Sequence, residues 1–168
     1  MQAITEKFQT PFGNLLIVTT KSNAPIVLAA GFGREADLLN RLQSTRPGLE
    51  ISSQKLNKKI SQAVTDWLDG NLTAFDSLRR DQIGSDFRQQ CWKAMSKIRP
   101  GFTISYAQLA ERTDSPRAVR AAATACAQNL IAPIIPCHRV IKSDGSLGRY
   151  GYGEATKRKI LEFEEKYL

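Results

Sequence analysis

Long hydrophobic runs are missing from this sequence of 168 residues. No segment approaches the roughly 18 uninterrupted apolar residues of a membrane-spanning helix, so we expect no membrane partner. The first residues, MQAITEKFQTPFG, also lack the basic and then apolar layout of a secretory signal peptide, which predicts a cytoplasmic protein. The hydrophobic content of 42% is nevertheless ordinary for a globular chain and too high for a disordered one.

Cysteine and histidine are scarce as well. The cysteines are Cys91, Cys126 and Cys137, and His138 is the single histidine. An odd number of cysteines argues against a disulfide framework. A zinc site would need all four of these residues, and the sequence has no C-x-x-C pair with the usual ligand spacing. We therefore expect no bound metal.

Acidic residues are in short supply, mainly in the second half of the chain. The net charge is +8. Residues 1–86 contain 10 Lys and Arg against 9 Asp and Glu, whereas residues 87–168 contain 14 against 7. An excess of positive charge confined to one half favours a polyanionic partner, such as nucleic acid, at that half. A basic surface that is merely solvated is the alternative.

The first part of the chain has the pattern of short strands followed by helical segments. FQTPFGNLLIVTT places a Pro-Phe-Gly-Asn turn between an alternating stretch and an apolar run, which predicts a β-hairpin, and APIVLAAGF favours a third strand. Apolar residues at helical spacing predict helices within residues 34–48 and 56–71. The polar stretch at residues 79–86 is the expected boundary. Residues 1–82 are therefore predicted to form a small structural domain with an antiparallel sheet and helix.

Residues 83–168 are predicted to form a mostly helical domain, which makes the fold class α+β. SDFRQQCWKAMSKI, SYAQLAERT and SPRAVRAAATACAQN carry capping residues and helical spacing. We expect the third of these helices to begin with Ser115 as its N-cap and Pro116 at the first helical position. Two short helices joined by a three-residue turn, with arginines on the second, are typical of a helix-turn-helix.

The second helix of this motif consists almost entirely of small residues. Arg117 and Arg120 precede a run that contains Ala121 and Thr124. One interpretation is a close contact with another helix. The other is DNA binding, because small side chains help a helix about 10–12 Å wide to enter a minor groove only about 6 Å wide. Arg117 and Arg120 lie three residues apart, so on a helix they would share one face.

The segment IIPCHRV, residues 134–140, is the candidate reactive site. Cys137 could be a buried structural cysteine, a metal ligand or a nucleophile. Its neighbours favour the nucleophile. His138 can take a proton, Arg139 and the basic half of the chain favour the thiolate, and Pro136 fixes the local backbone.

A carboxylate that could orient His138 is found by helical periodicity in EATKRKILEFEEKYL. Ile160, Leu161 and Leu168 mark the apolar stripe, and Glu164 lies four residues after the first and four before the last. A carboxylate on a stripe that faces a core needs a partner. His138 is one candidate, which would give a Cys-His-Glu relay. A Lys or Arg at the margin of the stripe is the other.

IIPCHRV, with Asn129 eight residues before the cysteine, resembles the active-site signature of the O6-alkylguanine-DNA alkyltransferases, or methylated-DNA–protein-cysteine methyltransferases. TISYAQLAERTDSPRAVRAAATACAQN and SDGSLGRYGYGEATKRKILEFE continue the resemblance. It is specific over about residues 85–165, whereas the N-terminal part resembles the family only in TPFGNLLIV and AVTDWLDGNLTAFD.

The resemblance implies a role for each matching residue of the reactive site. Cys137 would accept the alkyl group, activated by His138 through a water, with Glu164 behind it. Tyr106 would protonate or hydrogen-bond the departing guanine. Asn129 would hold the turn between the recognition helix and an active-site strand.

The resemblance also implies contacts with DNA and with the flipped base. Arg120 would fill the space left by the extruded nucleotide, and the backbone of Val140 would face the guanine edge. Tyr150 and Gly151 would lie on the loop near O6. Tyr152 departs from the family pattern, because many members have glycine there. Unless its ring turns to solvent, it is expected to narrow the pocket beside the alkyl group.

The function implied by the resemblance is direct reversal of O6-alkylguanine damage, with O4-alkylthymine as a second candidate substrate. The protein would bind double-stranded DNA through the minor groove, flip out the nucleotide and alkylate its own cysteine once, without a cofactor. It would be monomeric in the absence of DNA. Two alternatives remain: a non-catalytic module that recognises alkylated bases, which would not need Cys137, and a transcription regulator, which would not need His138 or Glu164.

Overall fold

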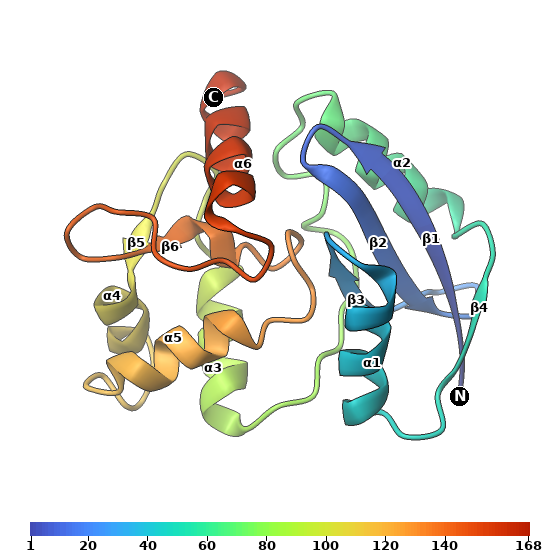
Figure 1. The fold of residues 1–168 in the computed structure, drawn as a ribbon, viewed down its shortest axis with the longest axis horizontal. Helices are drawn as coiled ribbons and strands as arrows, with labels where there is room; N and C mark the ends of the chain where they lie inside the picture. Colours follow the sequence, from blue (N-terminus) through green and yellow to red (C-terminus); the bar gives the residue numbers. More distant parts are fainter. The chain divides into compact units, whose positions relative to one another are not determined.

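The chain divides into two compact units. The computed structural model describes residues 1–168 (Figure 1). The first unit comprises Met1–Ile83 with Leu130–Ile134, and the second comprises Gly84–Asn129 with Ile135–Leu168. Helices and strands occur together, so the predicted α+β fold class is confirmed. None of the helices combines the length and the apolar content needed to cross a lipid bilayer.

The short segment Leu130–Ile134 departs from the predicted domain division. The sequence placed it in the second domain, but it belongs to the first unit, where it lies against β3 (Val27–Gly31). The Ala30 N–H donates to the Leu130 carbonyl at 2.8 Å, and the Ala132 N–H donates to the Ala30 carbonyl at 3.0 Å. These bonds use backbone groups that the edge of a strand would otherwise leave unpaired.

The first unit contains a four-stranded sheet in the order β3-β2-β1-β4. β1 (Gln2–Thr10) and β2 (Gly13–Thr20) are antiparallel neighbours, which confirms the predicted hairpin. β4 (Glu50–Ser53) pairs in parallel with β1, so the prediction of an antiparallel sheet is wrong for this strand. The reason is that α1 (Glu35–Thr45) links β3 to β4, and a helical crossover returns the chain in the same direction. The sequence of β4, EISS, has no alternating apolar pattern that would predict a strand.

The two faces of the sheet are covered by different helices. Lys7 lies on the face of β1 that meets α1, where its ammonium pairs with Glu35 at 2.6 Å. Glu6 points to the opposite face, and its carboxylate accepts from the Leu56 N–H at 2.8 Å just ahead of α2 (Lys58–Leu68). Alternation along the strand thus gives both faces a buried set of side chains. The buried cluster on the α1 side consists of Ala3, Leu16, Val18, Leu28, Ala29, Leu38, Leu42, Leu49 and Leu130.

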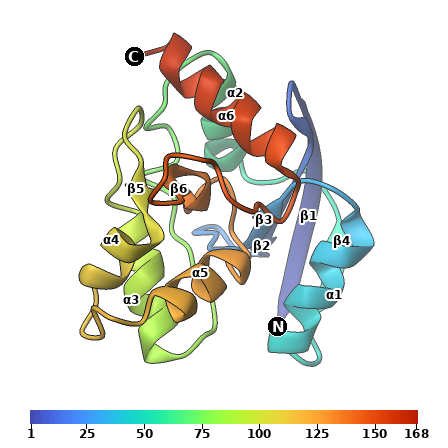
Figure 2. The ribbon, with the colours of Figure 1, turned by 60° about the vertical axis from the view of Figure 1, so that its left-hand side comes forward.

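The second unit contains helices and one very short pair of strands (Figure 2). β5 (Ile104–Ser105) and β6 (Val140–Ile141) run parallel. This pairing joins the segment that leads into Tyr106 to the segment that follows Cys137. The helices are α3 (Asp86–Met95), α4 (Tyr106–Glu111), α5 (Val119–Ala127) and α6 (Glu154–Lys166), together with the 3-10 turn η1 (Cys137–Arg139).

The helix-turn-helix has a longer connection than predicted. α4 and α5 pack against each other, but α5 begins at Val119 and not beside the predicted cap, Ser115. The Ala118 N–H donates to the Ser115 carbonyl at 3.0 Å, and the Val119 N–H donates to the Arg117 carbonyl at 2.9 Å, so these residues form a turn. Arg117 therefore lies outside the helix. The predicted helical face shared by Arg117 and Arg120 is wrong.

Candidate active site

Cys137 stands at the start of the 3-10 turn η1, directly after Pro136. The Cys137 N–H donates to the Ile135 carbonyl at 2.9 Å, and the Arg139 N–H donates to the Pro136 carbonyl at 3.0 Å. Only 7% of Cys137 is exposed. With about three residues per turn, successive side chains point in three different directions. The turn therefore presents the sulfur and the two side chains that follow it to different surroundings.

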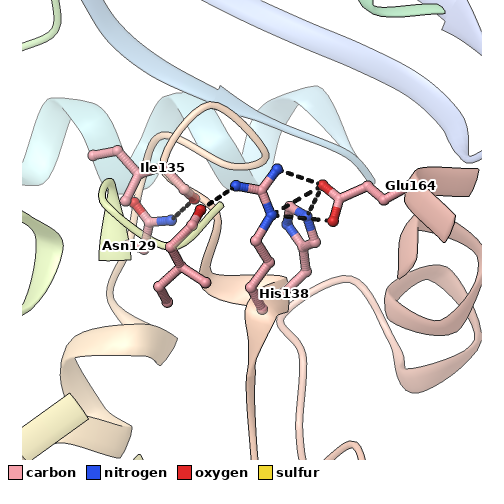
Figure 3. A network of polar contacts seen from close by, with 6 residues as sticks. Asn129, Ile135, His138 and Glu164 are labelled. Carbon is pink, nitrogen blue, oxygen red and sulfur yellow. Dashed lines mark hydrogen bonds and ion pairs between the residues drawn. The ribbon is translucent and has the colours of Figure 1, made fainter. Parts of the chain in front are cut away.

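The backbone ahead of the cysteine is held by Asn129 (Figure 3). Its buried Nδ2 donates to the Ile135 carbonyl at 2.9 Å, and the same carbonyl accepts the N–H of Cys137. Asn129 and Ile135 flank the segment Leu130–Ile134, so their hydrogen bond closes its two ends. Residues 130–136 contain bends, turns and one isolated bridge, and not the active-site strand that the resemblance implied. The position of the cysteine thus depends on the Asn129 side chain.

His138 and Glu164 form a buried hydrogen bond (Figure 3). His138 Nε2 lies 2.8 Å from Glu164 Oε1, and each residue is 1% exposed. An ionised carboxylate only accepts, so Nε2 carries the hydrogen and Nδ1 keeps a lone pair. Nδ1 is buried and has no hydrogen-bond partner in the structure. Burial lowers the pKa of His138 more than the charge of Glu164 raises it, so the ring is neutral and can accept a proton at Nδ1.

The charge of Glu164 is balanced by Arg139. Arg139 Nε lies 3.1 Å from both carboxylate oxygens, Nη2 lies 2.6 Å from Oε1, and Nη1 donates to the Ile98 carbonyl at 2.6 Å. Burial raises the pKa of Glu164, but the charge that His138 acquires in acid, the hydrogen bonds of both partners and the charge of Arg139 outweigh it and bring the pKa down to about 2. The sequence offered two candidate partners for Glu164, a histidine and a basic side chain. Both His138 and Arg139 bind it in the structure. The sequence predicts an effect of the Arg139 charge on the thiolate, but not this bond to Glu164.

The buried face of α6 carries the site's carboxylate. Its buried residues are Lys157, Ile160 and Glu164, at the spacing of one helical face. Leu161 is half-buried. Leu168, which the sequence reasoning counted in the stripe, lies beyond the helix end and is 72% exposed. That part of the predicted stripe is wrong, because the helix stops before reaching it.

Lys157 is a residue of the site that the sequence reasoning missed. It is 1% exposed, and its Nζ donates to the carbonyls of Val140 at 2.7 Å and Leu147 at 2.6 Å. These carbonyls lie on either side of the exposed turn at residues 142–146, so the ammonium closes the base of that loop. Nζ also lies 5.8 Å from the centroid of the Tyr106 ring. Helical spacing could have identified Lys157, because it precedes Glu164 by seven residues and so lies on the same face of the helix.

Tyr106 is the first residue of α4, which Ser105 caps through a hydrogen bond to the backbone. Burial raises the pKa of Tyr106 to about 12, so its phenol stays protonated and can donate. A Cβ on Gly148 would lie 3.0 Å from the phenol oxygen, and Gly148 has a φ of 73°. Glycine at this position lets the loop after β6 pass close to the hydroxyl.

The residues predicted to line the pocket occupy β6 and the segment that leads to α6. The rings of Tyr150 and Tyr152 meet edge to face, with centroids 5.5 Å apart and an interplanar angle of 75°. Both hydroxyl oxygens are buried, so Tyr152 does not turn its hydroxyl to solvent. Gly151 between them is exposed, and Val140 is fully buried.

The small residues of α5 serve two sides of the helix. Ala122 and Ala125 are fully buried, and Trp92 of α3 donates from Nε1 to the Ala125 carbonyl at 2.9 Å. The close contact with another helix, one of the two interpretations of these small residues, is therefore present. The opposite side of α5 is exposed and remains available for the other interpretation, DNA binding. Arg117 is exposed in the turn ahead of the helix. The exposed residues among those predicted for DNA binding on α5 are Arg120, Ala121 and Thr124.

The remaining cysteines are poorly suited to act as nucleophiles. Cys91 on α3 is fully buried, and burial raises its pKa to about 11. Burial also raises the pKa of Cys126 on α5. Since the thiolate is the reactive form, neither residue ionises readily. No group of three or more His, Cys, Asp or Glu side chains is placed to hold a metal ion.

Known proteins resemble this chain in sequence and in structure. Residues 86–166 match the family model described as 6-O-methylguanine DNA methyltransferase, DNA binding domain. The bifunctional transcriptional activator/DNA repair enzyme Ada of Escherichia coli is 48% identical over 133 residues, which are 77% of this chain but only 37% of that protein. A methylated-DNA–protein-cysteine methyltransferase of Mycobacterium leprae is 35% identical over 144 residues, which are 84% of this chain and 86% of that protein.

Among solved structures, the crystal structure of Mycobacterium tuberculosis OGT in complex with DNA superposes with a TM-score of 0.79. The sequence identity is 29%, and the match covers 100% of this chain and 95% of that one. The resemblance found in the signature IIPCHRV therefore extends over both units of the fold. The chain belongs to the family of the methylated-DNA–protein-cysteine methyltransferases.

Proposed function

We propose that this protein repairs DNA directly, by transferring an alkyl group from O6 of guanine to Cys137. The observation that carries the proposal is the buried His138–Glu164 hydrogen bond directly after the cysteine, because it leaves Nδ1 of a neutral ring as a base. Family membership supports the substrate class. O4-alkylthymine is a second candidate substrate.

The proposed reaction is a single displacement. His138 accepts the thiol proton at Nδ1 through a water, and the Cys137 sulfur forms a bond to the alkyl carbon while the bond from that carbon to O6 breaks. Tyr106, held as a neutral phenol by burial, donates a hydrogen bond to the departing guanine anion, and the proton that His138 took from the thiol is then released to neutralise the guanine. The thioether does not turn over, so each molecule reacts once. No step needs a cofactor.

We further propose that α5 docks in the minor groove of double-stranded DNA. The target atom lies inside the base stack, so the nucleotide must be flipped out before it can react. The exposed side of α5 supports this docking, because Arg120 stands beside Ala121 and Thr124, which are small. We expect a cytoplasmic protein that is monomeric without DNA.

The proposed function is tested by incubating the protein with a duplex that contains one O6-methylguanine and measuring the intact mass. We expect a single methyl adduct, located on Cys137 by peptide mapping. The same duplex with unmodified guanine is the control and should give no adduct. Tight binding to the methylated duplex without an adduct would contradict transfer and favour the non-catalytic recognition module.

Arg120→Ala is expected to slow repair of duplex DNA far more than reaction with free O6-alkylguanine base. The free base needs no extrusion, whereas the duplex loses the side chain that fills the gap, at a cost of a few kcal/mol at most. Single-turnover rates on both substrates measure the difference. Arg117→Ala is the matched control and should weaken DNA affinity without changing the rate at saturating DNA. Equal slowing of Arg120→Ala on both substrates would assign Arg120 to the fold.

Tyr152→Gly is expected to speed inactivation by O6-benzylguanine relative to methyl transfer. The Tyr152 ring packs against Tyr150 with its hydroxyl buried, and on the loop that the resemblance places near O6 it would take up volume that a benzyl group needs. Both rates must be measured on both proteins, since a looser loop could change the reactivity of Cys137 in general. An unchanged ratio of benzyl to methyl rates would place the ring outside the pocket.

A further inference from the structure

The Glu164 carboxylate has two partners that meet at the same oxygen. Oε1 lies 2.8 Å from His138 Nε2 and 2.6 Å from Arg139 Nη2. Glu164 and His138 are each 1% exposed, and Arg139 is 8% exposed, so water screens this cluster very little. A guanidinium keeps its charge at any physiological pH. The buried carboxylate therefore already has a cationic partner before His138 takes up a proton.

This arrangement removes the usual reason for a histidine beside a buried carboxylate to become charged. An ionised group in a protein interior is costly unless it is paired, and a lone carboxylate would favour protonation of its neighbour. Arg139 meets that requirement, so His138 needs to supply only a neutral N–H. The other charged group that acts on the ring is Lys157, also on α6, and its charge likewise opposes a second positive charge on His138.

We propose that Arg139 is a positioning residue that, together with the burial of the ring, keeps His138 neutral by sharing the Glu164 carboxylate. Nδ1 then retains the lone pair that takes the proton of Cys137. The inference rests on the proposed function only where it makes Nδ1 the base that takes the proton of Cys137. Without Arg139, only burial and Lys157 would oppose the carboxylate, so a larger share of the rings would be protonated, with a hydrogen on Nδ1 that prevents it from acting as the base.

The sequence offers a direct test, because His138 is the only histidine and its NMR signals report this site alone. In the wild-type protein we expect a neutral ring at neutral pH, with the hydrogen on Nε2 and titration below the ordinary value of 6.5. Arg139→Met should raise the pKa of His138 by about one pH unit or more, since an opposite charge then acts on the ring without compensation. Glu164→Gln should lower the pKa of His138 below the wild-type value, because only positive charges remain nearby.

The opposite directions of these two changes separate charge balance from loss of structure. Local unfolding would expose the ring in either variant and move its pKa upward toward 6.5. Arg139→Lys keeps the positive charge and should return the pKa of His138 toward the wild-type value. A wild-type ring that is protonated at neutral pH would overturn the proposal, even if Arg139→Met did not fold. A folded Arg139→Met variant that titrates like the wild type would overturn it as well.

These titrations need no DNA, so they stand whether or not the protein transfers alkyl groups. The wild-type methyl adduct tests the proposed function separately. Where that adduct forms, Arg139→Met should transfer methyl groups several-fold more slowly at neutral pH and should recover as the pH rises above the new pKa of His138. A rate that stays low at every pH would assign Arg139 to the fold alone and overturn the proposal.

Discussion

Cys137→Ser is expected to abolish alkyl transfer and to leave the affinity for DNA nearly unchanged. The thiolate is the reacting form of the side chain, and a serine hydroxyl does not ionise to a useful extent near neutral pH. DNA affinity depends mainly on contacts with phosphates, which the substitution does not alter. Intact mass after incubation with an O6-methylguanine duplex measures transfer, and fluorescence anisotropy with the same duplex measures affinity.

Cys126→Ser is the matched control for this experiment. Cys126 belongs to the same unit, and burial raises the pKa of its thiol, so we expect it to take no part in the chemistry. The control variant should therefore form the methyl adduct at a rate close to that of the wild type. An adduct on Cys137→Ser, at any residue and at a rate near the wild-type rate, would refute the assignment of the acceptor.

Glu164→Ala is expected to lower the free energy of unfolding by about 3–5 kcal/mol, the usual cost of removing one partner from a buried ion pair. The guanidinium of Arg139 and the imidazole of His138 would lose their shared acceptor while remaining buried. Methyl transfer should also slow by roughly 10²–10⁴-fold, because the base is no longer held in its reactive tautomer. Urea unfolding measures the first effect, and single-turnover kinetics measures the second.

Glu165→Ala is the control, since Glu165 is the next residue along α6 and is exposed. A substitution at an exposed position away from such contacts should change the free energy of unfolding by no more than about 0.5 kcal/mol. Similar losses in the two variants would mean that the buried contacts of Glu164 contribute nothing particular to stability.

Stability should fall as the solution becomes acidic, for two reasons that act in the same direction. The pKa of Glu164 is lowered from 4.5 to about 2 on folding, so its contribution is complete above pH 4.5 and is lost as the pH falls toward 2. The pKa of His138 is also lowered. Just below pH 6.5 the unfolded chain therefore binds a proton that the folded ring binds only at a lower pH. Urea unfolding across this range should show the decline in the free energy of unfolding. In Glu164→Ala, the part of that decline between pH 4.5 and 2 should be absent.

Local patterns in the sequence were sufficient for much of the fold and for half of the site. The hairpin around Pro11 could be predicted because a turn between an alternating stretch and an apolar run restricts its own backbone. Glu164 could be found because helical spacing alone decides which residues share the buried face of α6. Lys157 lies on that same face and could have been found in the same way. Cys137 and His138 could be recognised because they are neighbours in the chain.

Tertiary structure decided the features that depend on contacts between distant segments. β4 exists because β1 offers it backbone partners, and EISS has no strand pattern of its own. Leu130–Ile134 joins the first unit because backbone groups of β3 bind it, whatever its side chains favour. Arg139 pairs with Glu164 because a carboxylate buried 25 positions further along the chain requires a positively charged partner. Such a need arises only once the chain has folded and water has been excluded, so no local pattern of residues can reveal it.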